Sequence, residues 1–172
     1  MCAFPLHLWT IILAFRDFSW VTERTNAWDA VGVASYGLVF AFIESLVVFL
    51  AAILLGFLVS RKWSEDRRIA LLSVLVLVTS FWAMLSQLYF LLSISLSEQT
   101  ISFLAHHHPL RIMAAAGLVL VVPSVLLPTA LILRSDKTLQ FVRGLIERLS
   151  MLTLVYLFLD LAGLVILIIR NF

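Results

Sequence analysis

The chain has 172 residues, of which 63% are hydrophobic and 13% are charged, and its formal net charge is +2. Soluble domains carry about 45–50% apolar and about 25% charged residues, so this composition predicts an integral membrane protein. The small net charge gives no reason to expect a nucleic-acid partner, and the single cysteine, Cys2, excludes an internal disulfide.

The first segment, 3–15, is apolar but shorter than a membrane span, and a stretch of mixed charge, RDFSWVTERT, follows it. One interpretation is a short fifth helix embedded in the membrane. The other is a helix in the membrane interface, where aromatic side chains gather. Residues 6–15 are apolar on every face, which favours embedding because an interfacial helix needs a polar face. The interfacial alternative would use as anchors Trp9, Phe15, Trp20 and Trp28.

Four longer apolar runs follow, at 31–59, 69–96, 112–133 and 149–169. Each is long enough for a span, which needs about 20 mainly apolar residues. Backbone groups in lipid must bond within their own segment, so the runs predict helices. The expected fold is an all-α bundle of four transmembrane helices, with the short N-terminal helix as a fifth, in one domain.

Polar residues predict where some of these helices begin. Asn26, with an aspartate three residues later, predicts a cap before the first span, and Ser64 predicts one before the second. In the segment 136–148, apolar side chains recur at helical spacing, and Arg143 and Glu147 form an i,i+4 pair on the other face. This segment is either an amphipathic helix on the cytoplasmic surface or a solvated helical turn that joins two spans.

The basic residues predict an orientation. The connections 60–68 and 134–148 each carry four basic residues, whereas the connection 97–111 carries one arginine. The positive-inside rule therefore places 60–68 and 134–148 in the cytoplasm, and 97–111 and the C-terminus outside. The predicted location is the cytoplasmic membrane of a prokaryote.

Two acids and one side-chain amide lie inside the apolar runs: Glu44, Asp160 and Gln87. A charged group at the bilayer centre costs about 2.5–3.5 kcal/mol on insertion scales, so these residues should face protein or water. They hold helices together, dock a partner subunit that supplies the counter-charge, or form a proton or cation path. For Glu44 we expect a protonated carboxyl unless a cation such as Arg111 reaches it. The expected partners for the two acids are Gln87, Ser45, Ser80, Ser86 and Tyr156.

Other features are weaker indicators of a site. His106 and His108 point to the same side of an extended segment, which predicts at most two-point metal binding, because the usual three or four ligands are not completed. His7 stands alone in its segment, so the sequence indicates no haem or other cofactor. Pro123 and Pro128 predict a kink in the third span, since each removes a backbone donor.

No glycine-rich phosphate loop, G-x-S-x-G, H-E-x-x-H or C-x-x-C motif is found. The sequence therefore favours a non-catalytic structural or accessory subunit of a membrane assembly. Its expected partners are the lipid bilayer and other membrane subunits, or further copies of itself. An oligomeric small channel or transporter that uses Glu44 and Asp160 is the alternative. A membrane enzyme or redox-cofactor protein is a third hypothesis, with no motif behind it.

Overall fold

The computed structural model describes residues 1–60, 62–92, 95 and 97–172, and among these every regular element is an α-helix. The helices are α1 (Ala3–Arg24), α2 (Ala27–Leu58), α3 (Glu65–Leu91), α4 (Glu98–His106), α5 (Pro109–Arg134) and α6 (Asp136–Asn171). Four of them, α2, α3, α5 and α6, are long and apolar enough to cross a membrane. The predicted all-helical fold, with four helices of spanning length, is confirmed.

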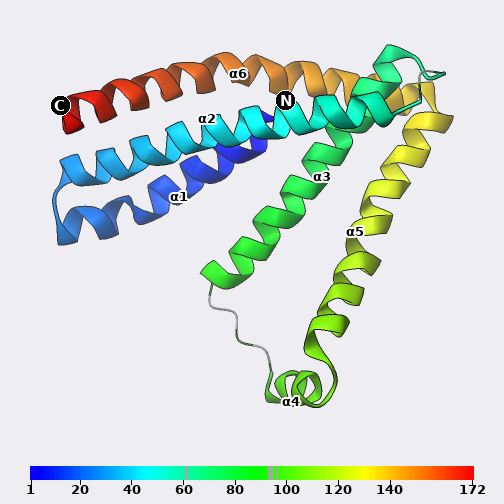
Figure 1. Ribbon diagram of the computed structural model, residues 1–172, viewed down its shortest axis with the longest axis horizontal. Helices are drawn as coiled ribbons and strands as arrows, with labels where there is room; N and C mark the ends of the chain where they lie inside the picture. Colours follow the sequence, from blue (N-terminus) through cyan, green and yellow to red (C-terminus); the bar gives the residue numbers. More distant parts are fainter. Residues whose placement is uncertain (61, 93–94, 96) are drawn as a thin grey trace.

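The helices form two groups that meet at one end (Figure 1). In the first group α1 folds back along α2, and α6 runs beside α2 in the opposite direction. In the second group α3 and α5 leave this layer at an angle, and α4 lies at their far ends. We call the shared end of the molecule the basic end, because it carries Lys62, Arg67, Arg68 and Arg134.

The helices differ in extent from the apolar runs. The segment 3–15 continues as α1 to Arg24, through the charged stretch. The run 149–169 and the segment 136–148 belong to one unbroken helix, α6. Helix α3 ends at Leu91, and residues 93, 94 and 96 of the predicted run 69–96 lie outside the described residues.

Capping side chains set several helix starts. The Asn26 Oδ1 atom accepts a hydrogen bond of 2.8 Å from the Asp29 amide, which confirms the predicted cap of α2. The Ser64 hydroxyl oxygen accepts a longer bond of 3.4 Å from the Arg67 amide ahead of α3. Helix α4 was not predicted from the sequence; Ser97 caps it in the same way, since its hydroxyl oxygen accepts from the Thr100 amide at 3.3 Å.

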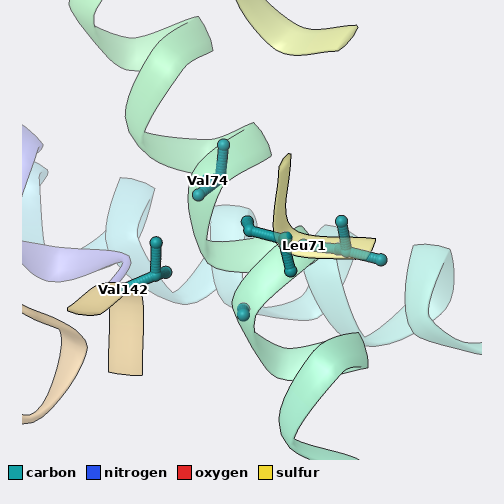
Figure 2. Close-up of a cluster of buried hydrophobic side chains, with 5 residues drawn as sticks. Leu71, Val74 and Val142 are labelled. Carbon is teal, nitrogen blue, oxygen red and sulfur yellow. The ribbon is translucent and has the colours of Figure 1, made fainter. Parts of the chain in front are cut away.

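A small apolar core joins α3, α5 and α6 at the basic end (Figure 2). Ile132 is fully buried there. Ion pairs surround this core: Arg67 bonds Asp136 at 2.8 Å, and Arg143 bonds both Asp66 at 3.0 Å and Glu147 at 3.1 Å. The predicted i,i+4 pair is therefore present. The remaining core side chains are Ala70, Leu71, Val74 and Val142.

Helix α5 stays continuous through Pro123 and Pro128. Between them, the Ser124 hydroxyl donates to the Val121 carbonyl oxygen at 2.7 Å, within the turn that Pro123 disturbs. The same hydroxyl oxygen accepts from the Trp82 indole N–H at 2.9 Å, so it also ties α5 to α3.

Helices α2 and α6 approach closely at two glycines. A Cβ atom at Gly163 would lie 3.3 Å from the Ser35 carbonyl oxygen, so the glycine permits this approach. Near the end of α6, the Arg170 guanidinium lies over Gly32, where a Cβ would collide with it. Arg170 also donates to the Trp28 carbonyl oxygen at 2.6 Å and forms an ion pair with Asp29. These contacts join the start of α2 to the end of α6.

Candidate functional site: a buried histidine–aspartate pair

Helix α1 carries His7 into the interior of the first group of helices. The His7 side chain is 1% exposed, and its Nδ1 atom lies 2.8 Å from the Ala3 carbonyl oxygen one turn earlier. Because a carbonyl oxygen can only accept, Nδ1 must carry a hydrogen, which fixes the ring with Nε2 pointing away from α1.

The Nε2 atom of His7 meets Asp160 of α6. It lies 2.9 Å from one carboxyl oxygen and 3.1 Å from the other. Asp160 is 7% exposed, so both members of the pair are buried. This contact joins residues 153 positions apart in the chain. It crosses directly from α1 to α6.

The pair shares one proton, and its net charge is zero in either arrangement. With the proton on Nε2, the contact is an imidazolium–carboxylate ion pair. With the proton on the carboxyl group, both partners are neutral and the Asp160 O–H donates to Nε2. A buried carboxylate without a partner is expensive in an apolar environment, and this pairing removes that penalty for Asp160.

The surroundings of the pair are partly aromatic and partly open. The Tyr156 ring stacks on the His7 ring, with centroids 4.7 Å apart and planes 19° from parallel. A cavity of about 260 Å³ borders the Asp160 carboxyl group and reaches toward α2. Its polar lining residues are Cys2, Ser45, Thr153, Tyr156 and Asp160. The Ser45 hydroxyl donates to the Ala41 carbonyl oxygen of its own helix at 2.6 Å, so it does not satisfy Asp160.

Asp160 lies near the middle of the apolar part of α6. It is 12 residues after Arg148 and 10 before Arg170. At 1.5 Å per residue, these intervals correspond to about 18 Å and about 15 Å. The two arginines are thus about 33 Å apart along the helix, close to the roughly 30 Å of a hydrocarbon core.

Glu44 lies at a different place. Its side chain is exposed on α2 and makes no hydrogen bond or ion pair with any described residue. It lines a second cavity, of about 330 Å³, together with Trp9 and Gln87. The cavities beside Glu44 and Asp160 have no lining residue in common, so the described structure does not bring the two acids together. Arg111 lies at the start of α5, beside α4 and away from α2 (Figure 1).

The histidines of the 97–111 connection are divided between two helices. His106 ends α4, and His108 precedes α5, so they do not form one extended segment. His106 Nδ1 lies 2.7 Å from the Ser102 carbonyl oxygen, which leaves its Nε2 atom open. Within the described part of the chain, no three His, Cys, Asp or Glu side chains are grouped to hold a metal ion.

The sequence placed Asp160 among the candidate residues but missed its partner. The sequence predicts Gln87, serines or Tyr156 as partners of the acid, and it predicts no role for His7 because no second histidine accompanies it. The sequence nevertheless contained an indication of this pairing. His7 and Asp160 are single titratable residues within apolar segments, and each needs a polar partner once it is buried.

Comparison with protein-family models, with curated proteins and with solved structures finds no match for this chain.

Proposed function

We propose that the protein is a non-catalytic structural or accessory subunit of a membrane assembly. The observation that carries this proposal is the His7–Asp160 contact, in which the acid near the middle of the apolar part of α6 is bonded to another helix of the same chain. An acid engaged in this way stabilises the packing of α1 against α6. Tyr156 covers the histidine ring on one side and supports the same role.

The proposed membrane position follows from the charges on α6. The interval between Arg148 and Arg170 matches the hydrocarbon thickness, which puts Asp160 near the bilayer centre. Helix α1 packs along α2 and brings His7 to the same depth, so α1 is embedded as a fifth membrane helix. The first turns of α6, 136–148, project beyond the hydrocarbon layer.

The proposed orientation puts the basic end in the cytoplasm. Residues 60–68 and 134–148 then lie inside a prokaryotic cell, while 97–111 and the C-terminus lie outside. The clustering of Lys62, Arg67, Arg68 and Arg134 at one end of the fold supports this choice.

Association with other subunits is supported by the little contact that α5 makes within the chain. Among the described residues of α5, Ile132 alone is buried. The remaining faces are available to lipid and to neighbouring helices, and membrane helices associate through close packing of such faces. Large exposed side chains on this helix include Leu110, Leu118, Val119 and Leu127.

The test is purification at native expression level in a mild detergent, followed by mass measurement of the intact particle. We expect a complex that contains other polypeptides in fixed stoichiometry. A particle made of this chain alone would contradict the proposal.

An oligomeric channel or transporter is the second candidate. It is favoured by one observation, the contact between the ionisable side chains of His7 and Asp160 beside a cavity of about 260 Å³. The test is proton and cation flux into liposomes that contain the purified chain. Flux that is lost in Asp160→Asn or in Glu44→Gln, with the oligomer intact, would establish this role.

A further inference from the structure

We propose that the groove beside Glu44 docks a transmembrane helix of a different protein, and that this helix carries a lysine or arginine that pairs with Glu44. The inference rests on the proposed function and adds the partner's chemistry and the surface that it contacts. The groove is the cavity of about 330 Å³ between α1 and α2, defined by Trp9, Leu13, Phe40, Glu44 and Gln87.

Glu44 lies near the middle of α2. It lies 15 residues after Asp29 and 14 before Leu58, the last residue of α2. Those intervals correspond to about 21–23 Å of helix on each side. The carboxyl group is therefore far from both ends of α2, in a region where an ionised group needs a counter-charge.

The groove has polar groups besides Glu44. The Trp9 Nε1 atom is buried and has no hydrogen-bond partner among the described residues. Gln87 lines the same groove from α3 and is exposed. The groove thus offers an exposed, unpaired acid and an exposed amide between apolar and aromatic walls, while its other acid, Asp17, is paired with Arg16. An apolar helix with one basic residue and free carbonyl or hydroxyl oxygens complements that set.

A second copy of this chain does not supply the cation. The four apolar runs contain no lysine or arginine. His7 is buried against Asp160. Arg16 is bonded to Asp17, at 2.6 Å and 3.0 Å, and lies seven residues beyond Trp9, about 10 Å along α1. A parallel copy therefore offers no free cation at the depth of Glu44, so the partner is a different protein.

The test combines photocrosslinking with a charge-neutral substitution. Photoreactive p-benzoylphenylalanine replaces Phe40 in the groove, or the exposed Leu161 on α6 as the positional control. Crosslinking is carried out in native membranes, and the attached polypeptide is identified by mass spectrometry. We expect the Phe40 position to capture a protein whose transmembrane segment contains a lysine or arginine.

Glu44→Gln keeps the size of the side chain and removes its charge. We expect it to lower the yield of this crosslink about tenfold or more, as when one partner of a buried charge pair is neutralised. Glu23→Gln, the same change at an exposed glutamate near the end of α1, should leave the yield unchanged. The thermal unfolding midpoint of Glu44→Gln should match the wild type, which separates lost docking from lost folding. Glu44→Lys with an acidic residue at the partner's basic position should restore the crosslink.

The results also separate this inference from the proposed function. If Glu44→Gln retains the full complex and the full crosslink yield, the inference fails while the accessory role stands. Adducts with lipid alone, with a second copy, or with a span that lacks a basic residue also overturn the inference. A wild-type particle made of this chain alone refutes both.

Discussion

At the scale of single residues, the most buried side-chain pair of opposite charge type among the described residues is the one between His7 and Asp160. Both groups are buried, and each is the polar partner of the other. Removing one member of a buried pair leaves the other unsatisfied, which is commonly worth about 3–5 kcal/mol in soluble proteins. Interhelical hydrogen bonds within membranes contribute less, about 0.6 kcal/mol on average. A pair with ionic character should fall between these limits.

We predict that His7→Leu and Asp160→Leu each destabilise the fold by more than about 1 kcal/mol, and that the double variant is less destabilised than the sum of the two. The measurement is a double-mutant cycle of reversible unfolding in detergent micelles. His7→Leu combined with Ser45→Ala is the matched control. Ser45 bonds its own helix, so this second pair should be additive. Additive losses for His7 and Asp160 would contradict the pairing.

The residue scale is also where sequence reasoning reached its limit. Long apolar runs identify Asp160 and Glu44 as unusual, because an ionised carboxyl group is costly within a segment that lies in lipid. Choosing His7 as the partner requires knowing that α1 folds back along α2 and also contacts α6. That arrangement depends on packing between segments about 150 residues apart, which spacing in the sequence does not encode.

At the scale of helices, the closest approach of α2 and α6 depends on Gly163. A Cβ there would already lie 3.3 Å from the Ser35 carbonyl oxygen, and a larger side chain has no room. Small residues at such crossings allow membrane helices to pack backbone against backbone. This site therefore sets the distance between the helices that carry the two polar candidates.

We predict that Gly163→Leu destabilises the fold by about 2 kcal/mol or more, because it forces α2 and α6 apart. Gly117→Leu in α5 is the control, since a Cβ at Gly117 has open space around it. Unfolding in micelles and the apparent size of the particle should distinguish the two variants. Equal stability of both would show that α2 and α6 do not pack as described.

A second prediction at this scale concerns the end of α6. Arg170→Gln should loosen the contact between α6 and the start of α2, because Arg170 bonds both the Trp28 carbonyl oxygen and Asp29. We expect faster amide hydrogen exchange in residues 27–32 and 165–171, with little change at the basic end. Unchanged exchange in both segments would rule out a stabilising role for this ion pair.

The extent of each helix was predictable to different degrees. The caps at Asn26 and Ser64 are local, so they could be found from neighbouring residues. The continuation of α1 to Arg24 was not predicted. Two side-chain contacts are present in this charged part of α1. Arg16 forms an ion pair with Asp17, and the Arg24 guanidinium lies 4.0 Å from the centre of the Trp20 ring. Helix α4 was missed because the Ser97 cap lies in a segment expected to be a loop.

At the scale of the whole molecule, the orientation can be tested directly. Cysteines at Ser64 and Ser102, in a chain whose Cys2 is replaced by alanine, are treated with a membrane-impermeant thiol reagent in intact cells. We predict labelling at Ser102 and not at Ser64, because the positive-inside rule predicts that the basic end faces the cytoplasm. Cells opened before treatment should label at both sites. Labelling of Ser64 alone in intact cells would reverse the assignment.

A rigid-body rotation of α3 and α5 about the core at the basic end would move their far ends much more than the core itself. Leu71 and its neighbours act as the pivot, and α3 continues 20 residues beyond it to Leu91 (Figure 1). At 1.5 Å per residue that arm is about 30 Å long, so a rotation of about 10° moves its far end by about 5 Å. The same rotation shifts the pivot side chains by less than about 1 Å, and a close-packed core with few voids resists even this displacement. Lateral pressure on α4 therefore acts on the core with a mechanical advantage of several-fold.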